Sequence, residues 1–237
     1  MDDNKSMNMR HNDLVGIGLY TVNDAAYLLK APARTIRRWM AGYTYAHEGD
    51  LRKVPPLWQP DIGIVEDQLE LSFRDLIELR FVRAFVGMGM DLRAIKSCME
   101  LARECEGSDR PFSSGRFRTD GKTIFLESLD RLDEPALIDL RKKQYVFKAV
   151  VEQTFRDLDL EQEIVRRWRP YKGKDSIVVD PKRSFGQPVA ARFGVPTIAL
   201  AEAVEAEGSV ARVAALYEVD QAVVRDAVKF HEGLVAA

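Results

Sequence analysis

Residues 20–42 read YTVNDAAYLLKAPARTIRRWMAG and predict two short helices joined by a tight turn. On the second helix Arg34, Arg37 and Arg38 follow the spacing i, i+3, i+4, which places their guanidinium groups on one helical face. The opposite face is expected to pack on the first helix and carries Ile36, Trp39 and Met40. A short helix with an apolar back and a basic front has the form needed to enter a DNA major groove. We therefore interpret this stretch as a DNA-binding module.

The ends of both helices carry their own signals. Thr21 and Asp24 predict a capping box at the start of the first helix. Pro32 suits the start of the second helix, where a backbone N–H is dispensable, and Gly42 suits its end.

The following stretch, residues 43–68, lacks helical periodicity and contains several prolines and glycines. We expect residues 51–54 and 68–71 to be the two strands of one hairpin, a candidate wing. Arg52 and Lys53 would then suit contact with DNA phosphates, although exposed basic residues are equally common on loops that bind nothing. Both interpretations are open at this point.

Two longer helices are predicted next, with Ser72 and Asp91 as their N-caps. The segment 104–111, ECEGSDRP, is expected to stop the second of them.

The overall composition limits the kinds of partner. The 237 residues include 35 basic and 37 acidic side chains, a formal net charge of −2. A bulk basic coat is thereby excluded, so a nucleic-acid contact must come from a local patch. Residues 1–13 are polar and are expected to form a disordered tail. No apolar run approaches the length of a membrane span, which indicates a cytoplasmic protein with no membrane partner.

The residues that commonly bind metals are few. Cys98 and Cys105 are too few for a disulfide scaffold, and neither has a neighbouring histidine or third cysteine to complete a metal site. The three histidines, His11, His47 and His231, are scattered. We expect no metal, no cofactor and no enzymatic activity.

Residues 106–172 are expected to form a mixed α/β connecting region. The apolar run 123–126 predicts a short strand, and the pattern of residues 145–158 predicts an amphipathic helix. Residues 129–140 predict a further helix, broken by Pro135.

A basic run at residues 166–170 surrounds Trp168. Such a run is suited to nucleic acid through charge and stacking. The alternative is that Trp168 packs in the interior while the arginines pair with the nearby carboxylates, Asp159, Glu161 and Glu163.

Residues 173–237 predict a strand at 176–179 and then a three-helix module resembling a helix-turn-helix. The expected N-caps of its helices are Thr197, Ser209 and Asp220. Asp220 and Asp226 nearly cancel the basic residues of the last helix, so attraction to phosphate is weak. We favour a protein-contacting or dimerising role here over DNA binding. The chain as a whole is expected to be mainly α with small β elements.

Three N-terminal motifs occur in the order and spacing of MerR-type winged helix-turn-helix proteins: Thr35-Ile36-Arg37-Arg38-Trp39, Leu71-Ser72-Phe73-Arg74-Asp75-Leu76 and Gly89-Met90-Asp91-Leu92-Arg93-Ala94-Ile95. Residues 14–105 therefore resemble that DNA-binding domain. The resemblance implies that the second helix enters the major groove and that the wing touches the DNA backbone. The implied contact residues are Arg34, Thr35, Arg37 and Arg38 on the helix, and Arg52 and Lys53 on the wing. MerR regulators usually continue into a dimerisation coiled coil, which the segment 104–111 interrupts here, so a dimer needs another surface.

The C-terminal motifs Asp180-Pro181, Gly186-Gln187-Pro188-Val189 and Gly194-Val195-Pro196-Thr197 resemble the small prokaryotic antitoxin domain catalogued as domain-of-unknown-function family four hundred thirty-three. Attached to a MerR-like N-terminus, this domain is similar to that of longer VapB-type antitoxins. The resemblance implies an antitoxin of a type II toxin–antitoxin pair. Such a protein represses its own operon through operator DNA and neutralises a PIN-domain toxin, a metal-dependent ribonuclease. A homodimer is expected, with the toxin contact within residues 106–237.

A second hypothesis is a MerR-like transcriptional regulator that responds to a small-molecule effector. It predicts an apolar pocket lined by Phe125, Tyr145, Phe147 and Phe155.

Overall fold

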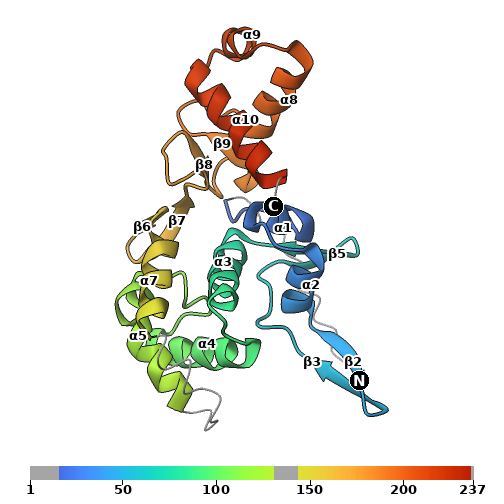
Figure 1. Cartoon of the computed structure of the whole chain (residues 1–237), viewed down its shortest axis with the longest axis vertical. Helices are drawn as coiled ribbons and strands as arrows, with labels where there is room; N and C mark the ends of the chain where they lie inside the picture. The colour runs from blue at the N-terminus through green and yellow to red at the C-terminus, as the bar shows by residue number, and fades with distance from the viewer. Residues whose placement is uncertain (1–15, 131–143, 236–237) are drawn as a thin grey trace.

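The computed structural model describes residues 16–130 and 144–235. Within these residues the chain forms nine α-helices and three small antiparallel sheets, and about half of the residues are helical. Figure 1 shows the helices within residues 197–235 at one end and those within residues 92–130 and 144–155 toward the other, with the hairpin of residues 43–54 projecting at the side. The fold is therefore mixed α/β. The expected disordered tail at 1–13, and most of the helix expected at 129–140, lie outside the described residues.

The two helices expected in residues 20–42 are present as α1 (Val22–Leu29) and α2 (Ala33–Ala41). The capping box of α1 is confirmed: the Thr21 hydroxyl accepts from the Asp24 backbone N–H at 3.1 Å, and the Asp24 carboxylate accepts from the Thr21 backbone N–H at 2.9 Å. Gly42 ends α2 as predicted.

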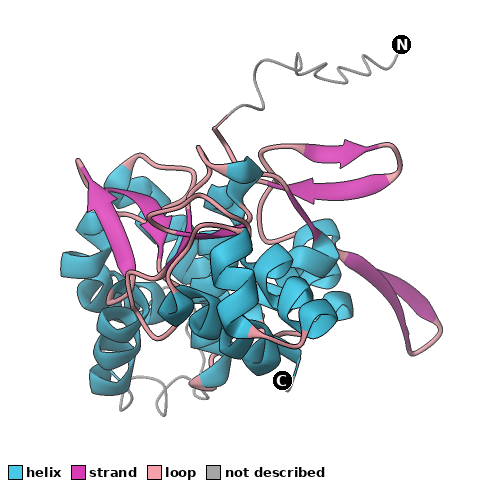
Figure 2. Ribbon diagram, turned by 90° about the horizontal axis from the view of Figure 1, so that it is seen from above, coloured by secondary structure: helices cyan, strands magenta, loops and turns pink. Residues whose placement is uncertain are grey.

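The wing predicted from residues 51–54 and 68–71 is wrong in its pairing. Strand β3 (Asp50–Val54) pairs instead with β2 (Tyr43–His47). Strand β5 (Gln68–Leu71) pairs with β4 (Gly63–Val65) and with β1 (Tyr20–Thr21) in a separate sheet. Two hairpins therefore extend from the helical body, as Figure 2 shows.

The turns of these hairpins explain the error. Each has two central residues with positive φ: Glu48-Gly49, Glu66-Asp67 and, in a later sheet, Gln162-Glu163. Positive φ at both positions is the type I′ arrangement, which is usually built from Asn-Gly or Asp-Gly. A residue other than glycine in this left-handed region costs about 1–2 kcal/mol. Five of these six turn positions hold a residue other than glycine despite this cost. The sequence therefore gives no strong signal for these turns.

Two long helices follow as predicted: α3 (Phe73–Gly87) and α4 (Leu92–Glu106). Ser72 and Asp91 cap them, each accepting a hydrogen bond from the backbone N–H three residues on, at 3.0 and 2.7 Å. Helix α4 stops at Gly107, which has a φ of 65°.

Helix α5 spans Gly115–Asp130, so the strand expected at 123–126 is wrong. Phe117, Ile124 and Phe125 are buried at the helical spacing i, i+7, i+8. Tertiary packing on this face overrides the preference of a short apolar run for a strand. The amphipathic helix expected at 145–158 is present as α7, Gln144–Phe155.

Seven fully buried phenylalanines lie at the centre of the core: Phe81, Phe85, Phe112, Phe117, Phe125, Phe147 and Phe155. Phe125 stacks on Phe147 with 4.2 Å between the ring centroids. Tyr145, by contrast, is 72% exposed. Of the four aromatic residues expected to line an effector pocket, Phe125, Phe147 and Phe155 are therefore core residues and Tyr145 lies on the surface.

The third sheet has the strand order β6-β7-β8-β9 and joins residues on both sides of position 173. Its strands are β6 (Leu158–Glu161), β7 (Ile164–Trp168), β8 (Ile177–Val179) and β9 (Pro188–Ala190). The strand expected at 176–179 is thus present. A short 3₁₀ turn, Ser184–Gly186, precedes β9.

Of the two interpretations of the basic run around Trp168, the structure supports the one in which Trp168 packs in the interior and the arginines pair with carboxylates. The Trp168 side chain is 5% exposed, and its indole N–H donates to Asp157 at 3.1 Å. Arg166 pairs with Glu161 at 3.3 Å, and Arg167 pairs with Asp159 at 3.1 Å.

Three helices close the chain: α8 (Thr197–Glu207), α9 (Val210–Leu216) and α10 (Gln221–Val235). They enclose a second, smaller core that includes Leu200, Val213 and Val224. Ser209 caps α9 as predicted. Thr197 is not the cap of α8 but its first residue, and its hydroxyl donates to the Pro188 carbonyl at 3.1 Å. No helix within the described residues has the length and apolar character needed to cross a bilayer.

A buried carboxyl group, that of Glu78 on α3, makes the stability of this fold depend on pH. Its Oε1 accepts from the backbone N–H and the hydroxyl of Ser113 at 2.9 and 2.8 Å. Its Oε2 has no hydrogen-bond partner among the described residues. Burial raises the pKa of Glu78 from 4.5 to about 7. The folded chain therefore binds this proton more tightly than the unfolded chain, so stability falls as the pH rises through this interval.

We expect Glu78→Gln to remove this contribution, which amounts to about 3 kcal/mol between the two ends of the interval. Urea unfolding of the wild type and the variant at about pH 5 and pH 8 measures the difference. Glu100→Gln, on the exposed side of α4, is the matched control. An unchanged pH dependence in Glu78→Gln contradicts the assignment.

Candidate nucleic-acid interface

Helix α2 has the two faces that its sequence predicts. Its apolar face is buried against the core through Ile36, Trp39 and Met40, which are 0, 6 and 1% exposed. On the other face Arg34, Arg37 and Arg38 are exposed, and Thr35 is half-buried. The predicted recognition residues of this helix thus share one accessible surface.

The β2–β3 hairpin continues the basic face of α2. The Arg38 guanidinium lies over the Tyr43 ring, 3.8 Å from its centroid, at the point where the hairpin begins. Tyr43, Tyr45 and His47 follow one another along β2, with 6.0 and 6.4 Å between successive ring centroids. Side chains two residues apart on a strand point to the same face. The three rings and Arg38 therefore form one continuous ladder, which we call the aromatic face of the hairpin.

Gly42 allows the hairpin to leave α2 at this angle. Its φ is 70°, and a Cβ atom at this position would lie 2.4 Å from the Val54 carbonyl oxygen. A larger residue would push the end of β3 away from the helix.

Strand register separates the two predicted wing residues. Arg52 lies opposite Tyr45, whereas Lys53 lies opposite Thr44. Directly opposed residues of antiparallel strands share a face, so Arg52 belongs to the aromatic face with Arg38. Lys53 belongs to the reverse face, beside Leu51, which is 80% exposed. The sequence predicted one wing with two equivalent basic residues, and the structure assigns them to opposite sides.

The surface formed by α2 and the hairpin is locally basic in an acidic chain. Between residues 33 and 54 it carries five basic side chains against two acidic ones, Glu48 and Asp50. Within residues 16–130 and 144–235, none of the five has an ion-pair partner: Arg34, Arg37, Arg38, Arg52 and Lys53. Unpaired cations on a projecting surface are suited to neutralise phosphates.

A buried polar network that the sequence did not reveal supports this surface. Asp75 accepts hydrogen bonds from the Trp58 indole at 2.8 Å and from Arg110 Nη2 at 2.7 Å. Arg110 also pairs with Asp61 at 2.7 Å. The network fixes the loop after the hairpin to α3. Arg110 comes from a loop 35 residues further along, and no sequence spacing connects it to its partners.

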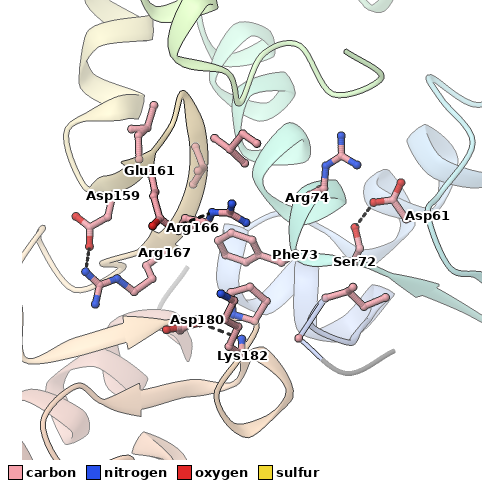
Figure 3. A pocket seen from close by; sticks show the side chains of 16 residues that line it. Asp61, Ser72, Phe73, Arg74, Asp159, Glu161, Arg166, Arg167, Asp180 and Lys182 are labelled. Atoms are coloured by element: carbon pink, nitrogen blue, oxygen red, sulfur yellow. Dashed lines mark hydrogen bonds and ion pairs between the residues drawn. The ribbon is translucent and has the colours of Figure 1, made fainter. Parts of the chain in front are cut away.

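A second candidate site is a groove of about 690 Å³ between the start of α3, the β6–β7 hairpin and the turn at residues 180–182. In Figure 3, Phe73 lies at its centre with Arg166 and Lys182 on either side. The charged residues that line it are four cations, Arg74, Arg166, Arg167 and Lys182, and four carboxylates, Asp61, Asp159, Glu161 and Asp180. The charges balance, so the groove has no preference for one sign of ligand.

Cys98 is fully buried, and burial raises the pKa of its thiol to about 12. A thiol in this state is neither a nucleophile nor a metal ligand. Among the described residues, no group of three or more metal-binding side chains comes together.

Comparison with known proteins gives a distant relative and a shared fold. No protein-family model matches the chain. It is 26% identical over 194 residues to the Mycobacterium tuberculosis protein named "Putative antitoxin VapB45", an alignment that covers 76% of this chain and 79% of that protein. Its fold matches the X-ray crystal structure of Rv2018 from Mycobacterium tuberculosis with a TM-score of 0.69. That match covers 90% of this chain and 99% of the other at 23% identity. The chain is thus similar to a protein named as an antitoxin.

The opposite orientations of Arg52 and Lys53 generate a paired prediction. We expect Arg52→Ala to weaken duplex DNA binding by about ten-fold, as the loss of a charge-assisted phosphate contact does. Lys53→Ala is expected to change affinity less than three-fold, on the order of the loss of a distant screened charge. Fluorescence anisotropy with one labelled DNA duplex measures both variants. Equal losses would show that the hairpin does not use its aromatic face.

Proposed function

We propose that this chain is the antitoxin of a type II toxin–antitoxin pair. It binds operator DNA as an autorepressor and neutralises a PIN-domain ribonuclease by direct contact. The observation that carries the DNA-binding half is the basic surface of α2 and the hairpin, whose five cations lack ion-pair partners among the described residues. Similarity to a protein named as an antitoxin supports the toxin-binding half.

Residues 14–105 are the proposed DNA-binding domain, and Arg34, Thr35, Arg37, Arg38 and Arg52 its contact residues. Arg34 and Arg37 are exposed on the outer face of α2, which supports the proposal that they contact base edges in the major groove. Arg38 is held over Tyr43 where the hairpin begins, and we propose that it contacts a phosphate beside the groove. Lys53 is proposed to contribute less to DNA binding, because it lies on the reverse face of the hairpin.

A homodimer is the proposed operator-binding form. A dimer would place two copies of α2 on the half-sites of an inverted repeat. Because α4 ends before Gly107, it does not extend into a coiled coil, and the contacts of the proposed dimer must come from another surface.

The proposed toxin-binding surface lies within residues 106–237, in the connecting region and the C-terminal domain from residue 173 onward. Large apolar side chains are exposed in this part of the chain and also between residues 19 and 86, so the candidates for the toxin contact are those that lie within the proposed region. They are Tyr145, Val146, Ile164, Phe185, Ile198, Leu216 and Val235.

Arg37 is the residue whose replacement tests base recognition. We expect Arg37→Ala to cost about 1–3 kcal/mol of operator affinity and to relax preference at one base pair. Arg118→Ala, an exposed arginine on α5, is the control and is expected to bind as the wild type does. A loss that is uniform across sequences, with a shallower salt dependence, would assign Arg37 to phosphate instead of a base.

Co-expression tests the toxin contact. Cells that express the protein encoded by the neighbouring gene are expected to stop growing, and this chain is expected to restore growth. Arg37→Ala should restore growth as well as the wild type, because it lies outside the proposed toxin surface. Toxicity that persists in the presence of the chain would rule out the antitoxin assignment while leaving the DNA-binding assignment intact.

A further inference from the structure

A second, smaller cavity of about 320 Å³ lies where the N-terminal and C-terminal parts of the chain meet. Its walls come from the end of α1, from α3, from the segment after β7 and from the last turns of α10. Its volume is at the lower end of the range of about 300–1,000 Å³ found for small-molecule sites. Figure 1 shows the end of α10 beside α1.

The lining of this cavity is strongly cationic. Five basic side chains contribute to it, Lys30, Arg80, Arg83, Lys172 and Lys229, against a single carboxylate, that of Asp157. This asymmetry distinguishes it from the larger groove, where four cations face four carboxylates.

Both oxygens of the single carboxylate, that of Asp157, already have partners within the protein. Asp157 Oδ1 pairs with Arg80 Nη2 at 2.6 Å, and Oδ2 accepts from the Trp168 indole at 3.1 Å. The Arg80 guanidinium also donates to the Thr154 carbonyl at 2.8 Å and lies 5.0 Å from the Trp168 ring centroid. Asp157 and Arg80 thus neutralise each other, and Asp157 has little left to offset the other cations.

The remaining cations have no carboxylate partner among the described residues. Lys30 Nζ donates to the Gly233 carbonyl at 2.6 Å, and Arg83 Nη2 donates to the Lys30 carbonyl at 3.2 Å. Lys172 Nζ lies over the face of the Tyr171 ring, 5.5 Å from its centroid. Lys229 has no ion pair or hydrogen bond to any described residue. Four exposed cations thus line one recess, and none of them is paired with a carboxylate of residues 16–130 or 144–235.

The shape of the site separates it from the DNA-binding surface. None of its lining residues belongs to α2 or to the β2–β3 hairpin. Duplex DNA requires a projecting or extended surface, whereas a recess of this volume accepts a small molecule. The aromatic residues Trp168, Tyr171 and Phe230 also line it, so a ligand with an apolar part next to its anionic group has a surface to pack on.

We propose that this cavity binds a small phosphate-bearing molecule. Arg83, Lys172 and Lys229 are the residues that bind its anionic group, and Tyr171 lies beside them. A tetrahedral, multiply charged anion satisfies several converging donors at once, which a halide or a single carboxylate does not. This inference goes beyond the proposed function and does not depend on it.

Binding is expected to stabilise the junction of the two parts. Lys229 lies on α10, Lys172 follows β7, and Arg83 lies on α3. One anion held by all three joins these elements, and a ligand that binds only the folded chain raises its melting temperature.

The test uses the full chain, with sodium pyrophosphate and adenosine monophosphate as separate probes at constant ionic strength. Calorimetric titration and thermal melting are measured for the wild type, for a Lys172→Gln/Lys229→Gln double variant, and for Lys148→Gln as control. Lys148 is an exposed lysine on α7 whose nearest carboxylate is 3.7 Å away. We expect at least one probe to bind at or below about 1 mM and the double variant to bind about ten-fold more weakly or not at all, with the control unchanged.

The outcomes separate this site from the DNA-binding surface. Absence of binding by both probes overturns the proposal, as does an equal loss in the Lys148→Gln control, which would indicate diffuse charge attraction. A double variant that loses operator affinity while neither probe binds would assign these lysines to DNA. Operator binding by the wild-type preparation is measured alongside, so failure of the anion site and failure of the proposed function are distinguished.

Discussion

The buried contact between Asp75 and Arg110 connects the segments on which the basic surface depends. Asp75 is completely buried at the start of α3 and accepts from Arg110 Nε and Nη2 at 3.0 and 2.7 Å. Removing one partner of such a pair costs about 3–5 kcal/mol, because the other is left as an uncompensated buried charge. The Trp58 indole donates to the same carboxylate, and the neighbouring Leu57 N–H donates to the Trp39 carbonyl at 2.8 Å. The back of α2 is therefore positioned through this network.

The cost of leaving a buried charge without a partner also determines which charged side chains are paired. Arg110 and Arg80, both largely buried, are each paired with a carboxylate, since an unpaired buried charge is too costly to retain. Exposed arginines need no such partner: Arg34, Arg37 and Arg52 remain solvated at little cost. A chain with a net charge of −2 can thus carry unpaired positive charge on a projecting surface. This local excess of positive charge is not visible in the composition of the whole chain.

The parts of this fold that the sequence predicts are those with local causes. Thr21, Ser72 and Asp91 identify helix starts because a cap needs only the next three residues. The hairpin pairing was missed because turns such as Glu66-Asp67 lack the glycine or asparagine that usually marks positive φ. The core packing of Phe117 against distant rings, which makes residues 123–126 helical, is also invisible locally. Of the site, the basic face of α2 was predictable from periodicity, whereas the opposite orientations of Arg52 and Lys53 require the register.

A neutral imidazole takes part in the contact between the N-terminal and C-terminal parts of the chain, beside the hydrogen bond from Lys30 Nζ to the Gly233 carbonyl. His231 on α10 contacts the Tyr27 hydroxyl through Nδ1 at 3.1 Å and the Thr197 hydroxyl through Nε2 at 2.9 Å. Because Thr197 gives its own proton to the Pro188 carbonyl, its oxygen must accept from Nε2–H, which leaves Nδ1 to accept from Tyr27. Burial lowers the pKa of His231 and so favours this neutral form. Protonation would place a proton on Nδ1 and remove the acceptor for Tyr27. Helix α10 is thus hydrogen-bonded to α1, and the apolar face of α2, opposite its basic face, packs on α1.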